Sequence, residues 1–251
     1  MKKKLRKNLI KENKIPLCEG VYDPGILKAV ILSGSAGSGK SYVAKSIFGI
    51  PDLPKFKSSL SSIGLKVVNS DSAFEVFLKK RGVDPKNLGK MTDKVFNYYT
   101  SRSPDTPKSK AQNIRDKLYN IYKDGRLGLI IDTTGSKLSS VIKKKKELEE
   151  LGYDVYLLFV NTSLKVGMAR NKKRTRVLPD KAVKQNYEEV QANISKYKSV
   201  FGNRFFEIDN NEDKPPIQAT QSKILRIVQA PVKNPIGKKW IETALKLKSL
   251  K

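Results

Sequence analysis

The sequence predicts an α/β fold in which a parallel sheet is covered by helices on both faces. Short, nearly continuous apolar runs alternate along the chain with segments of helical periodicity. Strands buried on both faces read as continuous apolar runs, and an alternating order of strands and helices is typical of a parallel sheet. With 251 residues, 38% hydrophobic and 30% charged, the chain is long enough for one globular domain with additions or for two small domains.

Each of the five expected strands ends where polar or glycine residues interrupt an apolar run. The five segments are 27–33, 64–70, 127–135, 153–161 and 204–209. Ligands of open parallel sheets bind at the carboxyl ends of the strands. The residues that follow each strand are therefore the candidates for function.

Helical periodicity fills the segments between the strands. A helix over 41–48 follows the first strand, and a short amphipathic helix follows the second. The polar segment 84–124 predicts two helices broken at 101–107, and another helix begins near Leu138. A single long helix is expected from an apolar stripe over five turns. That stripe consists of Val183, Tyr187, Val190, Ile194, Tyr197 and Phe201, and a last amphipathic helix carries Ile236, Trp240, Ile241, Ala244 and Leu245.

Two features of the composition exclude several kinds of chemistry. Cys18 is the single cysteine, so the chain cannot form an internal disulfide, and a structural zinc site lacks ligands. The chain has no histidine, which excludes Ser-His-Asp hydrolysis, Cys-His nucleophiles and histidine-bound metals. Acid–base work must therefore fall to carboxylates, lysine or tyrosine.

The apolar runs indicate a cytoplasmic protein without a membrane partner. The longest runs, such as 127–131 and 156–160, have the length of strands and fall far short of the roughly 20 apolar residues that span a bilayer. The basic segment 1–14 is not followed by the apolar region of a secretory signal.

About half of the net charge of +27 is concentrated at the two ends of the sequence. Residues 1–14 carry seven Lys or Arg and one Glu, and residues 222–251 carry eight and one. Such segments bind nucleic acid through its phosphates, although a solvated tail and a solubilising helix face explain the charge equally well. We expect a basic tail over 1–23, a domain over 24–210 and a basic helical extension over 211–251.

A phosphate-binding loop follows the first strand. The sequence GSAGSGKS fits the pattern G-x-x-x-x-G-K-[ST] and lies between a buried strand and a helix, as the motif requires. Its backbone N–H groups would cradle the phosphates of ATP, Lys40 would reach the β- and γ-phosphates, and the Ser41 hydroxyl would ligate Mg²⁺. The loop consists of Gly34, Ser35, Ala36, Gly37, Ser38, Gly39, Lys40 and Ser41.

Aspartates follow the second and third strands. Asp71 is placed to accept the proton of an acceptor hydroxyl, with helix capping by Asp71 itself, or by Ser72 with Glu75, as the structural alternative. Asp132 follows four apolar residues and would hold a Mg²⁺-bound water beside Ser41. No Glu follows Asp132, which argues against a helicase or a packaging motor.

An arginine-rich segment follows the fourth strand. Arg170 and Arg174 are expected as i, i+4 neighbours on one helix face, with Arg176 following as the helix ends before Pro179. In a lid over about 168–180, these cations would neutralise charge during phosphoryl transfer. A solvated helix face or a nucleic-acid patch is the alternative.

These motifs and their order resemble the polynucleotide-kinase and zeta-toxin branch of small P-loop kinases, especially versions encoded by tailed bacteriophages. The resemblance covers about 24–210. It implies a P-loop NTPase-type three-layer sandwich with a five-stranded parallel sheet of order 2-3-1-4-5, a helical acceptor insert over about 84–124 and an Arg-rich lid. It also implies Lys40 and Ser41 for phosphate and Mg²⁺, Asp71 as the base, and a bacterial host cytoplasm as the location.

Three functions remain open on sequence grounds. The first is an ATP-dependent kinase of a nucleic-acid 5′-hydroxyl. The second is a zeta-toxin-like kinase of a small nucleotide or nucleotide sugar. The third is a nucleic-acid-binding or virion-associated protein that keeps the triphosphate site as a switch. The identity of the acceptor, the preferred base of the nucleotide and the oligomeric state do not follow from the sequence.

Overall fold

The computed structural model contains the expected parallel sheet. It describes residues 20–23, 25–50, 60–212 and 217–249, so the basic segment 1–14 lies outside the described residues. The strand order is β2-β3-β1-β4-β5, and all four neighbouring pairs are parallel, which confirms the predicted order. The strands are β1 (Lys28–Ser33), β2 (Lys66–Val68), β3 (Leu129–Asp132), β4 (Asp154–Asn161) and β5 (Phe205–Asp209).

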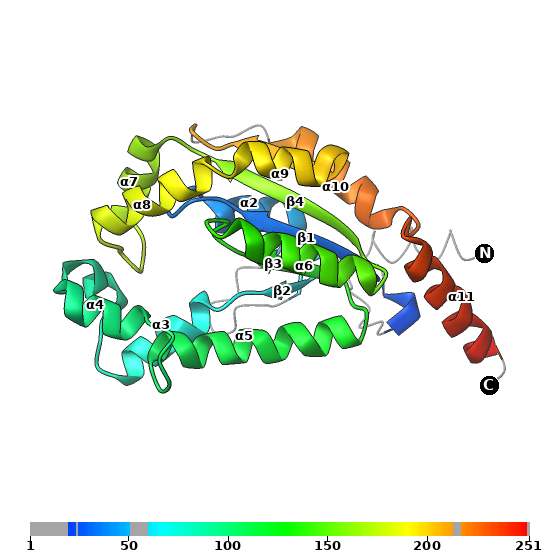
Figure 1. Ribbon diagram of the computed structural model, residues 1–251, viewed down its shortest axis with the longest axis horizontal. Helices are drawn as coiled ribbons and strands as arrows, with labels where there is room; N and C mark the ends of the chain where they lie inside the picture. The colour runs from blue at the N-terminus through cyan, green and yellow to red at the C-terminus, as the bar shows by residue number, and fades with distance from the viewer. Residues whose placement is uncertain (1–19, 24, 51–59, 213–216, 250–251) are drawn as a thin grey trace.

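Helices cover both faces of the sheet, which gives the three layers (Figure 1). Successive strand residues point to opposite faces, so Ala29 and Ile31 join one apolar cluster while Val30 and Leu32 join the other. The first cluster includes residues of α6 (Leu138–Glu150), α8 (Asp180–Gln191) and α9 (Ile194–Phe201). The second includes residues of α2 (Lys40–Phe48) and α10 (Ile217–Gln229). The sheet is therefore buried on both sides.

The insert between β2 and β3 builds a small apolar cluster of its own. It comprises α3 (Asp71–Lys80), η2 (Pro85–Lys90), α4 (Asp93–Thr100) and α5 (Pro107–Asp124), and the break between α4 and α5 falls where the sequence predicts it. The Thr106 hydroxyl accepts a hydrogen bond from the Ser109 N–H, and Pro107 occupies the first turn, which together start α5. The cluster consists of Phe74, Leu78, Val83, Leu88 and Ala111.

The expectation of one long helix over five turns is wrong, because the chain forms two helices there. α8 ends at Gln191 and α9 begins at Ile194. Between them, the buried Asn193 side chain donates to the carbonyls of Gly135 and Ser136. The apolar stripe continues across this break, which explains why its periodicity resembled that of one helix.

α10 is a helix that the sequence reading did not predict. Ile217, Ile224 and Val228 are buried in the second apolar cluster, and α10 packs against α2. The Gln221 amide also donates to the Ser46 carbonyl of α2. This part of the expected extension over 211–251 therefore contributes to the core.

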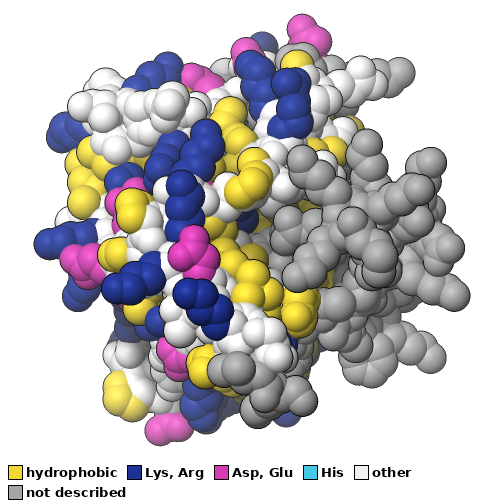
Figure 2. Space-filling model, turned by 90° about the vertical axis from the view of Figure 1, so that its right-hand side faces the viewer, with side chains coloured by type: hydrophobic (Ala, Val, Ile, Leu, Met, Phe, Trp, Pro, Cys, Tyr) yellow, Lys and Arg dark blue, Asp and Glu magenta, His cyan; other side chains and the backbone are white. Residues whose placement is uncertain are grey.

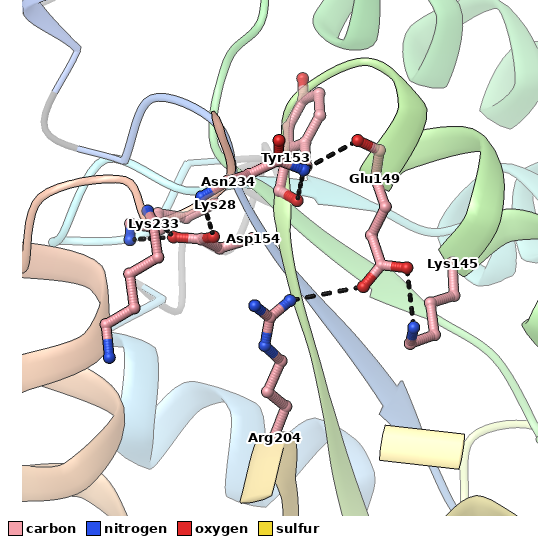
Figure 3. Close-up of polar contacts among 8 residues, drawn as sticks. All are labelled: Lys28, Lys145, Glu149, Tyr153, Asp154, Arg204, Lys233 and Asn234. Carbon is pink, nitrogen blue, oxygen red and sulfur yellow. Dashed lines mark hydrogen bonds and ion pairs between the residues drawn. The ribbon is translucent and has the colours of Figure 1, made fainter. Parts of the chain in front are cut away.

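α11 (Pro235–Ser249) is fastened to the sheet by a buried polar network (Figure 3). The Asp154 carboxylate accepts hydrogen bonds from Lys28 Nζ at 2.8 Å and from the backbone N–H groups of Lys233 and Asn234. The Asn234 side chain caps α11 by accepting from the Ile236 N–H, and it donates to the carbonyls of Glu149 and Tyr153. Burial lowers the pKa of Lys28, and the neighbouring Asp154 carboxylate opposes that shift.

The end of the molecule that carries α4 lies opposite the end that carries α11. In Figure 1, α4, α7 (Leu164–Lys172) and α8 lie at the left and α11 at the right. Figure 2 shows the α11 end with many exposed Lys and Arg side chains and fewer Asp and Glu. No helix in the described part of the chain is long and apolar enough to span a membrane.

Candidate active site

The sheet register brings the predicted residues together at the carboxyl ends of the strands. Leu32 pairs with Asp132, and Val68 pairs with Ile131. The loop after β1, the start of α3 and the end of β3 therefore meet at one edge. A cavity of about 590 Å³ lies there, and its wall includes Lys40, Asp71 and Asp132.

Two positions of the P-loop (residues 34–41) require glycine, both because of their backbone conformation and because a Cβ atom would have no space. Gly37 has φ +81° and Gly39 has φ +85°, in the left-handed region. A Cβ on Gly37 would overlap the carbonyl oxygen of Gly167 in α7, and a Cβ on Gly39 would overlap the Asn210 side chain. The loop is therefore packed directly against α7 and against the chain that follows β5.

Lys40 lies inside the loop that it is predicted to serve. Its Nζ donates to the carbonyls of Gly34 at 2.6 Å and Ser35 at 3.1 Å. Burial lowers the pKa of Lys40, while Asp132 opposes that shift. The ammonium is thus held by carbonyls of the loop, and Lys40 is among the residues that line the cavity.

Asp71 faces the arginines that follow α7. Its carboxylate lies 3.0 Å from Arg176 and 4.0 Å from Arg174. Burial raises the pKa of Asp71, but Arg176, Lys108 and Arg174 lower it, and the net shift is downward. Asp71 is thus a carboxylate in contact with the predicted lid.

The capping alternatives for Asp71 are wrong. Ser70 precedes the first residue of α3, which is Asp71, and the Ser70 side chain makes no cap hydrogen bond. The Asp71 N–H is instead bonded by the side-chain oxygen of Asn69. Neither Asp71 nor Ser72 is therefore the residue before the helix, and the Asp71 carboxylate is left to face the cavity.

Asp132 and Ser41 both line the cavity and offer oxygen ligands of the kind that Mg²⁺ prefers. Burial raises the pKa of Asp132 to about 6, with Lys40 opposing and Asp71 adding to the shift. Asp132 Oδ2 accepts from the Asn69 amide at 2.9 Å, whereas the buried Oδ1 has no hydrogen-bond partner among the described residues. The described residues contain no group of three or more His, Cys, Asp or Glu that could hold a metal ion. Mg²⁺ commonly binds through one or two protein oxygens together with substrate phosphates, so this donor set suits it.

The helical part of the predicted lid is shorter than expected. α7 ends at Lys172, so Arg170 and Arg174 do not share a helix face, and that expectation is wrong. Arg170 instead donates to the carbonyls of Asn210 and Glu212, although it still lines the cavity. Pro179 directly precedes α8 and does not stop α7.

A side-chain clasp explains this early end. The Asn171 amide donates to the Leu178 carbonyl and accepts from the Leu178 N–H, which closes the chain into a loop after α7. This loop carries Arg174 and Arg176 towards Asp71.

Comparison with known proteins supports the fold. Neither a family model nor a curated protein matches the chain. Among solved structures, it is similar to a chain of the PezAT chromosomal toxin–antitoxin system of Streptococcus pneumoniae, with 14% identity and a TM-score of 0.50, covering 98% of this chain and 93% of that one. At this identity the likeness concerns the fold alone. The sheet order and the loop after β1 are those of the P-loop kinase fold.

Two further solved structures are more distant. A shikimate kinase from Acinetobacter baumannii has 14% identity and a TM-score of 0.42, covering 81% of this chain and 94% of that one. A chain of the Pnkp1/Rnl/Hen1 RNA repair complex has 19% identity and a TM-score of 0.45, covering 68% of this chain. This chain matches 46% of the length of that one, less than half.

Three asparagines at the site were missed by the sequence reading. Asn69 joins the backbone of Asp71 to the carboxylate of Asp132, and Asn210 donates to the Ser38 carbonyl. Asn186 of α8 accepts from the Ala36 N–H. Asn69 and Asn210 directly follow β2 and β5, so the rule that ligands bind at strand ends would have found them. Asn186 lies inside a helix and gives no such signal.

Residues of the insert also line the cavity and carried no recognisable motif. They are Phe96, Thr100, Arg102, Lys108, Gln112 and Arg115. Lys108 lies over the Phe74 ring at 5.1 Å, on which Arg176 also lies at 5.2 Å. The cavity therefore joins the P-loop to a cationic wall that is built by the insert.

Proposed function

We propose that this protein is an ATP-dependent kinase that transfers the γ-phosphate to the 5′-hydroxyl of a nucleic acid. The observation that carries the proposal is Asp71, a carboxylate in the same cavity as the P-loop and in contact with Arg176. A P-loop kinase needs a phosphate cradle, an acceptor carboxylate and cations for the transferred group. The P-loop, Asp71 and the arginines that would take these three roles line one cavity.

In the proposed reaction the acceptor oxygen attacks the γ-phosphorus. A bond forms between these atoms, the bond from the γ-phosphorus to the β–γ bridging oxygen breaks, and ADP leaves. The hydroxyl proton passes to the Asp71 carboxylate. Positioning and charge stabilisation supply most of the rate enhancement in phosphoryl transfer, so the chain's role is to hold these groups in line.

Arg176 links phosphate binding to the basicity of Asp71. The arginine lowers the pKa of Asp71 while the two are paired. A triphosphate entering the cavity offers Arg176 new oxygen partners, and bidentate arginine–phosphate pairs are strong. When Arg176 turns to the phosphate, Asp71 loses its strongest cation and becomes a better base. A triphosphate in the cavity would thus raise the basicity of Asp71.

Lys40 and Arg174 would neutralise charge on the transferring group, as cations do in other phosphoryl-transfer sites. Ser41 and Asp132 are the residues that would hold Mg²⁺. When bound there, the ion would supply positive charge that offsets the negative charge of the phosphates. Main-chain N–H groups of the P-loop complete the cradle.

Charge favours a nucleic acid as the acceptor. The chain carries a net charge of +27, and the insert presents Arg102, Lys108 and Arg115 to the cavity. Phe96 adds an aromatic ring to the same wall, and aromatic rings stack on bases. A neutral acceptor would gain nothing from these cations.

The test is transfer of label from γ-labelled ATP to a panel of acceptors. The panel contains a 5′-hydroxyl oligonucleotide, nucleosides, nucleotides and a nucleotide sugar, with Lys40→Ala as the control for contaminating kinases. We expect the oligonucleotide to be labelled by the wild type and not by the variant, with an apparent affinity that falls steeply with salt because counterions are released.

Two results would contradict the proposal. Exclusive labelling of a small nucleotide or nucleotide sugar would keep the kinase and replace its acceptor. Tight, salt-sensitive nucleic-acid binding without any labelling would favour a binding protein with a triphosphate switch.

A further inference from the structure

The wall of the cavity that the insert builds has more positive charge than ATP needs. Arg102, Lys108 and Arg115 line this wall. Among the described residues that line the whole cavity, two are carboxylates, Asp71 and Asp132. Lys40 belongs to the P-loop, and Arg174 and Arg176 of the lid are already paired with Asp71. The three cations of the insert therefore remain for the acceptor.

Two of these cations lie on one face of α5. Lys108, Gln112 and Arg115 are separated by four and three residues, which places them in one row along the helix. We call this row the α5 stripe. Tyr119 is one turn further along, and Lys144 of α6 lies over its ring at 3.9 Å. The row of cations thus continues beyond the cavity wall towards α6.

The α5 stripe has a direction relative to the reacting centre. Lys108 and Arg176 lie over the same Phe74 ring, and Arg176 contacts Asp71. The Lys108 end is therefore next to the proposed base. Arg115 lies seven residues further along α5, a rise of roughly 10 Å. A phosphodiester bound at Lys108 would lie close to the phosphate that is being transferred. A phosphodiester bound at Arg115 would lie farther along the acceptor strand.

Arg115 is available to an incoming phosphate. Its present partner is its neighbour Asp116, at 2.6 Å, and the Asp116 side chain is 57% exposed. Exposed ion pairs contribute little to stability. A phosphate that accepts two hydrogen bonds from the guanidinium is a stronger partner, so the Asp116 pair does not block the site.

We propose that the α5 stripe binds the first two phosphodiesters after the reacting nucleotide, with the first at Lys108 and the second at Arg115. The acceptor is then a strand of at least three nucleotides that leaves the cavity along α5 towards Lys144. This inference rests on the proposed kinase function and specifies the substrate, because it requires a strand and excludes a lone nucleotide.

The test removes the charge of one linkage at a time. A 5′-hydroxyl trinucleotide is compared with two versions in which the first or the second linkage is a neutral methylphosphonate. With the wild type, we expect the second substitution to lower kcat/KM about tenfold, the loss of one charge-assisted hydrogen bond. With Arg115→Ala, the same substitution should lower kcat/KM less than about twofold, because its partner is already gone.

The matched control is Lys117→Ala. Lys117 is exposed and lies two residues after Arg115 on α5, off the stripe. This variant should respond to both methylphosphonates as the wild type does. Lys108→Ala should lose its response to the first linkage and keep its response to the second.

The outcomes separate this inference from the function on which it rests. Equal losses at the second linkage in the wild type and in Arg115→Ala would overturn the stripe while transfer itself continues. A mononucleotide phosphorylated as efficiently as the trinucleotide would also overturn it. If no oligonucleotide is phosphorylated at all, the proposed function fails, and this inference fails with it.

Discussion

Asp132 is held as a carboxylate where burial opposes its charge. Its pKa is raised to about 6 in the folded chain, from an ordinary value near 4. A carboxyl group with a raised folded pKa binds protons more readily when folded, so stability falls as pH rises between these values. The penalty is present in full above about pH 6 and absent below about pH 4. The site thus costs the protein stability when no ligand is bound.

We therefore expect Asp132→Asn to raise the Tm of the ligand-free protein at pH 7.5, with the gain shrinking at pH 4.5. Thermal unfolding monitored by circular dichroism at both pH values measures the difference. Glu188→Gln, which changes an exposed carboxylate of α8, is the control and should show neither effect. A lower Tm for Asp132→Asn at pH 7.5 would contradict the prediction.

Replacing Arg174 should have a large effect on kcat. Arg174 lies 4.0 Å from Asp71, on the cavity wall. Losing a cation that stabilises the transferring group should lower kcat on the order of 100-fold or more. Lys173→Ala, its exposed neighbour in the same segment, should leave kcat nearly unchanged. Steady-state kinetics of both variants decide the matter, since a merely solvated arginine would behave like Lys173.

Among single residues, those belonging to short motifs were predictable. Lys40 and Asp71 follow β1 and β2 and lie where the sequence placed them, in one cavity. The separation of Arg174 from the helix that carries Arg170 was not predictable, because the clasp between Asn171 and Leu178 that ends the helix leaves no periodic signal. The chemical roles of all these residues stay predictions.

The P-loop and α7 form one packed unit at the scale of elements. A Cβ at Gly37 would overlap the Gly167 carbonyl of α7, so Gly37→Ala must displace α7 and the arginines that follow it. Gly82→Ala is a matched control, because Gly82 also has a positive φ and has open space around its Cβ position. Both variants should lose roughly 1–2 kcal/mol of stability from backbone strain.

Only Gly37→Ala should also lose most of its ATP binding and transfer. Unfolding by urea and ATP titration measure the two effects separately. Equal ATP affinity in Gly37→Ala and Gly82→Ala would show that α7 does not depend on this contact.

The strands were predictable as elements because their apolar runs are continuous and short. The division of α8 from α9 was not, since the buried Asn193 that lies between them interrupts no apolar position. α10 was missed although its buried residues, Ile217, Ile224 and Val228, have the spacing of a single helix face. Only contact with α2 gives that face its role.

At the scale of the whole molecule, α11 depends on one buried ion pair far from the cavity. Lys28 and Asp154 are both at most 2% exposed. Asp154→Ala would leave Lys28 unpaired and remove the acceptor of two backbone N–H groups, so we expect a loss of about 3–5 kcal/mol. Glu150→Ala, which breaks the exposed pair with Lys146, should cost less than about 0.5 kcal/mol.

Chemical unfolding at pH 7 compares these two variants. Similar losses for Asp154→Ala and Glu150→Ala would mean that the network in Figure 3 does not hold α11 in place. The sequence indicated the amphipathic α11 but not its anchoring, because Lys28 and Asp154 lie 126 positions apart and meet only through the pairing of β1 with β4.

In the proposed reaction Asp71 serves the acceptor and not the nucleotide. This role is tested most directly by measuring ATP affinity and single-turnover transfer side by side for the wild type and Asp71→Asn. The asparagine keeps the size of the side chain and removes the proton acceptor. We expect ATP affinity to stay within a few-fold while transfer to a 5′-hydroxyl oligonucleotide falls by orders of magnitude. Collapse of ATP affinity with an unchanged transfer rate would contradict it.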